Sequence, residues 1–205
     1  MRNILLFTFG FVTLGTLSVV EAGPPLICHP YSTGGAKSLP WGDGSDWNNP
    51  APSYDVAKLA NDAFGFLDAT TPVLVRMETL RRATLYGAKD HDQARALLAR
   101  LAERVKASEE SAKPSASALF DYGYFLSSLH QVAWLYKEDL TGGLDGYDIV
   151  TKALVIDPSS PEMHFAAALM TFSPPRPSER EEHLRIARAA KHDALLAQNL
   201  STHFQ

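Results

Sequence analysis

The sequence predicts an all-α protein, and three observations support that prediction. Apolar residues recur at the spacing of amphipathic helices through most of the chain after Ser53. Prolines, glycines and helix-capping residues interrupt these stretches at short intervals. Alternation of apolar and polar residues, which is typical of strands, is nowhere sustained. We therefore expect a stack of helices, preceded by a leader and a non-helical arm.

The leader, residues 1–22, has the pattern of a secretory signal peptide. Arg2 supplies a positive start, residues 4–20 form an almost wholly apolar run, and residues 20–22, Val-Glu-Ala, suit a cleavage site. An uncleaved membrane anchor is the alternative, but the run is short for a bilayer span and contains two glycines. We expect cleavage after Ala22, export to the periplasm or the medium, and no stable membrane insertion afterwards.

Residues 23–52 are rich in proline, glycine, asparagine and aspartate, which break helices and strands and favour turns. They predict an extended N-terminal arm. Its apolar side chains are too many for a solvated linker, so we expect the arm to pack on the helical body. They are Leu26, Ile27, Leu39, Trp41 and Trp47.

Residues 53–205 form one predicted helical domain, long enough to enclose a core. The clearest apolar stripe runs from Leu119 to Tyr136 over five turns. Turn and capping residues separate the stripes, for example at Thr70-Thr71-Pro72 and Asp157-Pro158. Helices are expected at residues 54–68, 73–87, 91–107, 116–138, 145–156, 161–172, 178–190 and 193–203.

The stretch YDIVTKALVIDPSSPEMHFAAALMTF resembles a tetratricopeptide repeat, a pair of helices joined by a turn with an acidic residue and proline. Ala153 and Ala187 are one 34-residue period apart. Gly146 departs from the pattern, which has alanine at that place. The start of the chain is also similar to exported bacterial helical-repeat proteins of no assigned activity. The resemblance implies antiparallel helix pairs stacked as a short right-handed superhelix.

A repeat stack of this kind has a concave face lined by the first helix of each pair, and that face binds proteins or peptides. Carrying the groove positions of the family onto this chain gives two sets of three. They are Ser128, Gln131 and Leu135 on one helix and Glu162, Phe165 and Leu169 on the next. The alternative is that Phe165 and Leu169 belong to the core.

The charge pattern limits the classes of partner. The net charge of -4 is the same before and after removal of the leader, and no broad cationic face is evident. We therefore expect no nucleic-acid binding. The favoured function is an exported, non-enzymatic binding or scaffold module for a protein or peptide, without a cofactor.

The alternative function is a thiol- or metal-dependent enzyme centred on Cys28 and His29. Cys28 is the only cysteine, so no internal disulfide can form. A nucleophilic thiol needs a cation or a helix N-terminus beside it, whereas adjacent residues in extended chain point to opposite sides. No two histidines lie three or four residues apart, so no metal pair on one helix is predicted. We expect Cys28 to be a packed residue.

Overall fold

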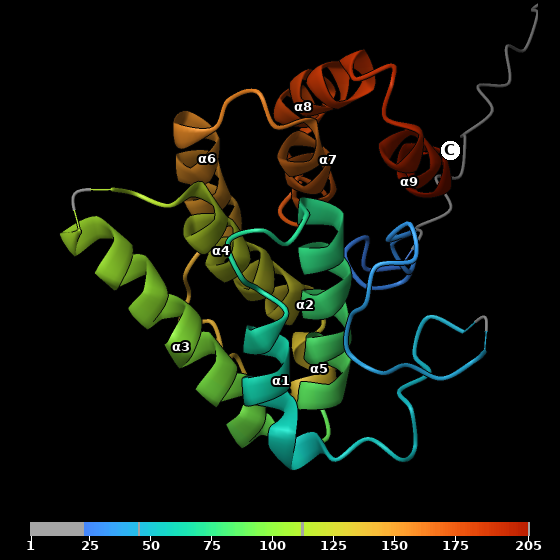
Figure 1. The fold of residues 1–205 in the computed structure, drawn as a ribbon, viewed down its shortest axis with the longest axis vertical. Coiled ribbons are helices and arrows are strands. Elements are labelled where there is room, and N and C mark those ends of the chain that lie inside the picture. The colour runs from blue at the N-terminus through green and yellow to red at the C-terminus, as the bar shows by residue number, and fades with distance from the viewer. Residues whose placement is uncertain (1–22, 45, 112, 205) are drawn as a thin grey trace, which may run out of the picture.

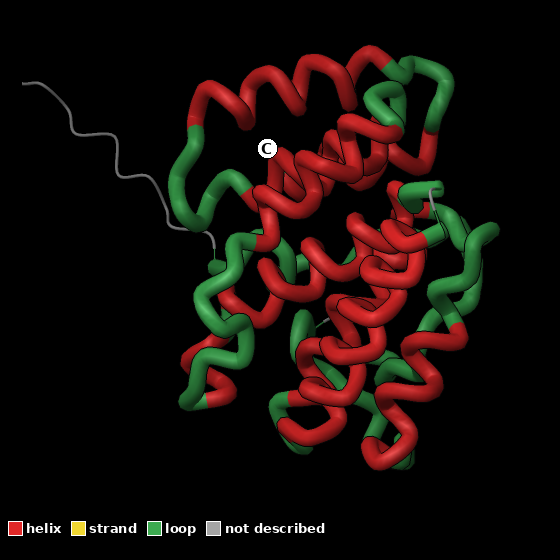
Figure 2. The backbone as a smooth tube through the Cα atoms, turned by 90° about the vertical axis from the view of Figure 1, so that its left-hand side faces the viewer, coloured by secondary structure: helices red, strands yellow, loops and turns green. Residues whose placement is uncertain are grey.

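The computed structural model describes residues 23–44, 46–111 and 113–204, and it confirms the all-α prediction. Over these residues nine α-helices, one short 3-10 turn and no strand are present (Figures 1 and 2). The predicted leader, residues 1–22, lies outside the described residues. The helices are α1 (Leu59–Gly65), α2 (Val73–Gly87), α3 (His91–Glu110), α4 (Ala116–Gln131), α5 (Ala133–Tyr136), α6 (Gly146–Ile156), α7 (Pro161–Met170), α8 (Pro177–Ala189) and α9 (Ala194–His203).

Local sequence sets where most of these helices begin. The side chains of Ser115, Asp145, Ser160 and Asp193 each accept a hydrogen bond from a backbone N–H two or three residues further on. Such caps satisfy amide donors that have no partner inside the helix. These four helices start within one residue of the predicted positions, whereas α1 starts at Leu59, five residues after the predicted start at residue 54.

The predicted helix over residues 116–138 is interrupted. Val132, at φ -121° and ψ 26°, ends α4, and the single turn α5 follows before Lys137 adopts a left-handed conformation. Val132 is fully buried, so the interruption lies inside the core, and its β-branched side chain has a slightly lowered helix propensity. At the other end of the domain, a 3-10 turn at Val56–Lys58 precedes α1.

Helices α4 and α6 approach each other through glycines. A Cβ atom placed on Gly123 would lie 2.6 Å from the backbone oxygen of Gly146, and one on Gly146 would collide with the backbone oxygen of Gly123. This contact explains why Gly146 stands where the repeat pattern has alanine. Helices α7 and α8 form a second neighbouring pair. The superhelical repeat itself stays a prediction.

Residues 24–54, where described, contain no helix or strand and are called the N-terminal segment below. The segment runs beside α2 and continues below α9 in Figure 1, where it is blue to cyan. Leu26, Ile27 and Leu39 have no exposed surface and join the same core as the helices. The N-terminal segment is therefore packed on the helical body, including α9 at the C-terminal end of the chain.

A buried ion cluster joins three helices of the body. Asp121 on α4 accepts hydrogen bonds from Arg76 on α2, at 2.6 Å, and from Arg104 on α3. Burial raises the pKa of Asp121 to about 6, although both guanidinium groups favour its ionised form. None of the described helices is both apolar enough and long enough to cross a bilayer.

Candidate functional site

The predicted groove residues do not line an open groove in the described structure. Ser128, Gln131, Phe165 and Leu169 are buried, with exposed fractions of 9% or less. Leu135 and Glu162 are partly exposed. The alternative reading of Phe165 and Leu169 as core residues therefore agrees with their position.

The N-terminal segment covers part of this predicted groove. The side-chain carbonyl of Gln131 accepts a hydrogen bond from the backbone N–H of Leu26 at 2.9 Å. The ring of Phe165 meets that of Tyr31 edge to face, with 6.1 Å between ring centroids. Two residues predicted to contact a peptide thus contact a stretch of the protein's own chain.

Further side chains of the body bind the backbone of the N-terminal segment. Glu78 accepts from the N–H of Tyr31 at 3.0 Å, and Arg81 donates to the carbonyl of Ile27 at 3.1 Å. Asn199 on α9 makes two bonds to Ser32, accepting from its N–H at 2.9 Å and donating to its carbonyl at 3.0 Å. We call Glu78, Arg81, Gln131 and Asn199 the segment-binding face. Its bonds go to backbone atoms, which every peptide possesses.

The charges on this face compensate one another. Glu78 is fully buried and receives hydrogen bonds from Arg81 at 2.8 and 2.9 Å and from Arg82 at 2.6 Å. Burial opposes ionisation of Glu78, but the bonds and charges of the two arginines outweigh it and hold its pKa below the usual range. Glu78 is therefore ionised at neutral pH, and its carboxylate accepts the backbone N–H of Tyr31.

Aromatic rings close the face on the side of α9. His203 stacks on Tyr31 with 4.6 Å between ring centroids and 10° between the planes. Both ring nitrogens of His203 are buried without a hydrogen-bond partner. Burial, followed by the charges of His29 and Arg81, lowers the pKa of His203 to about 4. This ring is consequently neutral at neutral pH.

Cys28 and His29 lie at the edge of this face. Cys28 is half-buried and His29 is exposed. Burial raises the pKa of the Cys28 thiol, although the charge of Arg81 acts in the opposite direction. A nucleophilic cysteine needs a lowered pKa. No group of three His, Cys, Asp or Glu side chains among the described residues is arranged to hold a metal ion.

A chain of hydrogen bonds links α6, α7 and α8. His164 Nε2 lies 3.1 Å from the carbonyl of Pro158, which can only accept, so this nitrogen carries a proton. His164 Nδ1 then accepts from His183 Nδ1 at 2.8 Å, and His183 Nε2 accepts from the Tyr147 hydroxyl at 2.9 Å. Each polar atom of the chain is used in holding the helices together.

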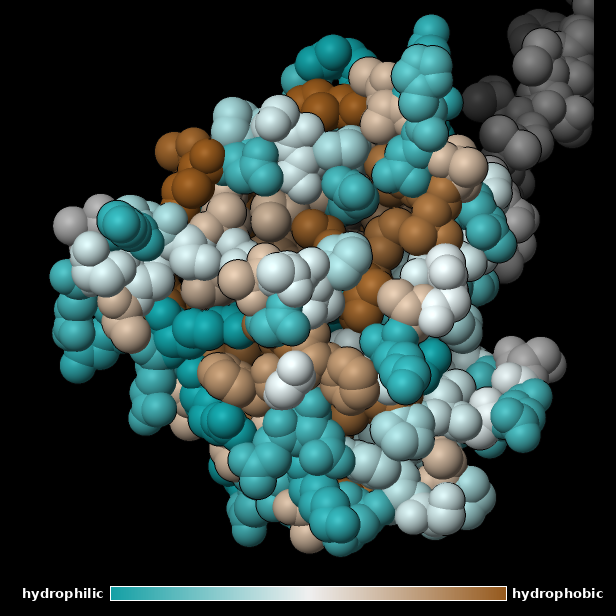
Figure 3. Space-filling view, in the orientation of Figure 1, coloured by the Kyte–Doolittle hydropathy of each residue, from teal (hydrophilic) through white to brown (hydrophobic). Residues whose placement is uncertain are grey.

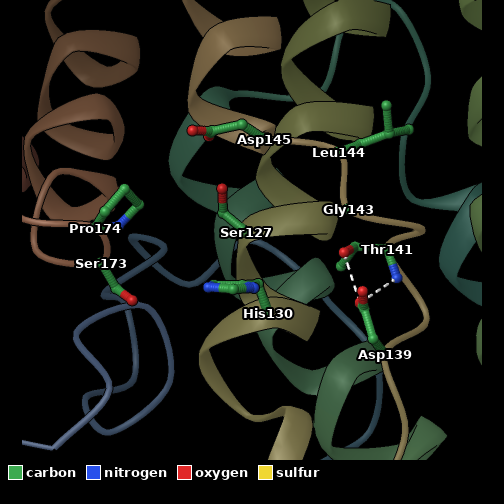
Figure 4. Close-up of a pocket in the computed structure, with 10 residues that line it drawn as sticks. Ser127, His130, Asp139, Thr141, Gly143, Leu144, Asp145, Ser173 and Pro174 are labelled. Carbon is green, nitrogen blue, oxygen red and sulfur yellow. Dashed lines mark hydrogen bonds between the residues drawn. The ribbon is translucent and has the colours of Figure 1, made fainter.

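An open cavity of about 210 Å³ lies beside α4 (Figure 4). The loop between α5 and α6 forms one wall, and the turn between α7 and α8 forms another. In Figure 4 the hydroxyl of Ser127 is directed toward Asp145, and the ring of His130 toward Ser173. The lining residues are Ser127, His130, Asp139, Thr141, Gly143, Leu144, Asp145, Gly146, Ser173 and Pro174.

Sequence reasoning missed Glu78, Arg81 and Asn199 and all residues of the cavity. The spacing of Glu78 from Arg81 and Arg82 is visible in the sequence, but the same i, i+3 and i, i+4 pattern is ordinary on solvated helix surfaces. No local pattern distinguishes Asn199. Of the predicted groove residues, Gln131 and Phe165 do contact the N-terminal segment.

Comparison with known proteins adds no relative, since no protein family, no curated protein and no solved structure matches the chain.

Proposed function

We propose that this protein is an exported, non-enzymatic binding module that recognises a non-helical stretch of a protein or peptide. The site of recognition is the segment-binding face, which includes part of the predicted concave face of a tetratricopeptide-like stack. In this proposal the N-terminal segment is a built-in ligand, and a partner takes its place. The helix pairs elsewhere in the body and the cavity beside α4 are not part of this proposed site.

One observation carries the proposal: side chains of the helical body bind a non-helical stretch of chain through its backbone. The N–H groups of Leu26, Tyr31 and Ser32 are all bound by side chains of the body. Bonds to the backbone supply affinity for a peptide, and pockets for individual side chains supply specificity. Here the buried Leu26, Ile27 and Tyr31 side chains occupy such places.

The tether sets how strongly a partner must bind. A short flexible connection gives an attached ligand an effective concentration on the order of millimolar. A free partner at micromolar concentration must then bind about a thousandfold more tightly than the isolated segment would. Exchange should therefore be difficult in the intact chain and easy once the connection is cut.

The test severs the connection in the complete, folded protein. A protease recognition sequence is inserted after Asp43, which is exposed, so that cleavage frees residues 23–43. A fluorescent synthetic peptide of residues 23–43 is then added, and its binding is followed by anisotropy. We expect saturable binding, competition by the unlabelled peptide, and no competition by a peptide of reversed sequence.

A matched pair of variants on α9 locates the binding. Asn199→Ala removes two hydrogen bonds, a loss of about 2 kcal/mol, so the peptide should bind roughly thirtyfold more weakly. Gln198→Ala changes an exposed neighbour and should leave the affinity unaltered. If removal of the cleaved peptide abolishes the helical circular dichroism, the segment is a core element and the proposal fails.

A further inference from the structure

His203, in the last turn of α9, is a buried titratable side chain at the edge of the segment-binding face. It follows Asn199 by four residues, so both side chains lie on one side of α9. Asn199 bonds to Ser32, and the ring of His203 stacks on Tyr31 with 4.6 Å between ring centroids. This side of α9 therefore contacts two consecutive residues of the N-terminal segment.

Aromatic rings surround the imidazole of His203. Phe165 on α7 and His29 on the segment each meet it edge to face, with 5.5 and 5.4 Å between ring centroids. Both nitrogens of His203 are buried and have no hydrogen-bond partner among the described residues. A neutral ring fits such surroundings better than a charged one, because a charge loses far more hydration on burial. A protonated ring would bring a positive charge and two N–H donors into this place.

Most charged groups around His203 also oppose its protonation. His29 on the segment and Arg81 on α2 disfavour a positive charge on the ring, and Glu78 on α2 favours it. Burial is the largest cause, and together with the two cations it lowers the pKa of His203 to about 4. The face of Tyr31 attracts a cation, but a single ring does not replace the lost hydration.

Release of the segment would remove much of this restraint. Tyr31 and His29 would leave the ring of His203, and an exposed histidine has a pKa near 6.5. The released form therefore binds a proton more readily than the packed form. By linkage, packing of the segment is most stable above about pH 6.5 and becomes weaker as the pH falls toward 4.

We propose that protonation of His203 releases the N-terminal segment, so that the segment-binding face is closed at neutral pH and opens to a partner in acid. This inference rests on the proposed function, since release has a use only if a partner takes the place of the segment. The ring of His203 is the titrating group, and the segment is the part that moves. A partner that leaves His203 in contact with water would be favoured over the segment in acid.

Amide hydrogen exchange in the intact protein, followed by NMR, measures opening of the segment. The reporters are the N–H groups of Tyr31 and Ser32, which Glu78 and Asn199 bind at 3.0 and 2.9 Å. Each rate is compared with that of an unfolded amide at the same pH. Between about pH 7.5 and pH 5 we expect their protection to fall by roughly fivefold to thirtyfold, the larger value for a wholly shielded ring. Unchanged protection would overturn the proposal.

His203→Phe and His183→Gln form a matched pair of variants. His183 is also a buried histidine whose pKa is lowered to about 4, mainly by burial, but it lies on α8 and bonds to Tyr147 and His164. His203→Phe keeps a ring beside Tyr31 and cannot titrate, so the fall in protection should disappear. His183→Gln should retain the fall. An equal reduction in both variants would mean that the segment opens only when the whole molecule unfolds, which would contradict the proposal.

A second variant guards against misfolding of the first. His203→Leu also lacks a titratable group, and circular dichroism at neutral pH establishes which of the two variants folds. Either folded variant should show protection that is independent of pH over the same range. Protection that still falls in a folded variant would assign the effect to another group and overturn the proposal.

The severed protein separates this inference from the proposed function. The labelled peptide of residues 23–43 is titrated at about pH 7.5 and pH 5, and we expect its affinity to be at least roughly fivefold weaker in acid. Equal affinity at the two pH values would overturn the acid response alone. A peptide that does not bind at neutral pH, while protection in the intact chain still falls in acid, would overturn the proposed function and confirm the release.

Discussion

At the scale of single residues, polar side chains of the body act by binding another part of the chain. Asn199 is 1% exposed, but both ends of its amide bond to Ser32. Glu78 is neutralised by Arg81 and Arg82 and still accepts from Tyr31. Buried polar groups are stabilising only when such partners are present. Loss of the N-terminal segment would therefore leave several buried groups without partners, unless a ligand replaced it.

Cys28 is the residue at which the binding and enzyme hypotheses differ most. Burial raises its pKa, so little thiolate exists at pH 7, and we expect slow reaction of the native protein with a thiol reagent. Unfolding in urea should accelerate labelling, and His29→Ala should not change the native rate. The rate is measured by mass spectrometry. Rapid labelling below pH 7 that depends on His29 would favour the enzyme hypothesis.

At the scale of secondary-structure elements, the α4–α6 contact is limited by backbone atoms. Gly146→Ala would place a methyl group against the backbone oxygen of Gly123 and the hydroxyl of Ser127. We expect a loss of about 1–3 kcal/mol in the free energy of unfolding, because the two helices must separate. Urea unfolding followed by circular dichroism measures the change.

Gly65 at the end of α1 is the control, since a Cβ atom there meets nothing within 4 Å. Gly65→Ala should raise the free energy of unfolding by about 0.4–1 kcal/mol through the unfolded state. Both variants replace a glycine by alanine. A lower free energy of unfolding for Gly146→Ala and a higher one for Gly65→Ala would therefore assign the loss to the α4–α6 contact. Equal signs would show that the α4–α6 interface relaxes easily.

At the scale of the whole molecule, apolar and polar surface are unevenly distributed. On the face drawn in Figure 3, apolar colour shows mainly in the upper half, near α6 and α9, although the region of α8 at the top is hydrophilic. Hydrophilic colour dominates below, over α1 and α3. Leu144, Phe172, Val155 and Trp134 are large apolar residues with more than a third of their surface exposed. The segment-binding face combines residues of α2, α4 and α9.

Two buried histidines at different places make overall stability depend on pH. Burial, and then the neighbouring His164, lowers the pKa of His183 to about 4, although Glu182 and Glu179 oppose the shift. His203 is lowered to about 4 as well, with Glu78 opposing. The unfolded chain, with histidine pKa values near 6.5, binds more protons between these values, so stability is full above about pH 6.5 and is lost toward pH 4.

We expect the free energy of unfolding to fall by about 3 kcal/mol between pH 6.5 and pH 4. This is roughly half of what the two lowered pKa values would give together, because neither ring is wholly shielded from water. Urea unfolding at several pH values measures it. His183→Gln should reduce the slope between pH 6.5 and 4, whereas His192→Gln, at an exposed position, should not. An unchanged slope in His183→Gln would contradict the cause assigned here.

The sequence alone determined the local features of this protein. Apolar periodicity and the turn and capping residues between the apolar stretches predicted the helices. In the structure Ser115, Asp145, Ser160 and Asp193 cap four of them. These signals act over three or four residues, so they can be read without knowledge of the fold. The prediction of a continuous helix over residues 116–138 was wrong, because α4 ends before Val132.

Only the tertiary structure decided which residues share a site. Leu26 and Gln131 are 105 positions apart, and Ser32 and Asn199 are 167 apart. No local pattern encodes such pairings, because they depend on how all the helices pack together. The cavity likewise requires α4, a loop and a distant turn to meet. The local sequence of the chain specifies its helices. The contacts among the helices lower the free energy only collectively, and these contacts create both the segment-binding face and the cavity.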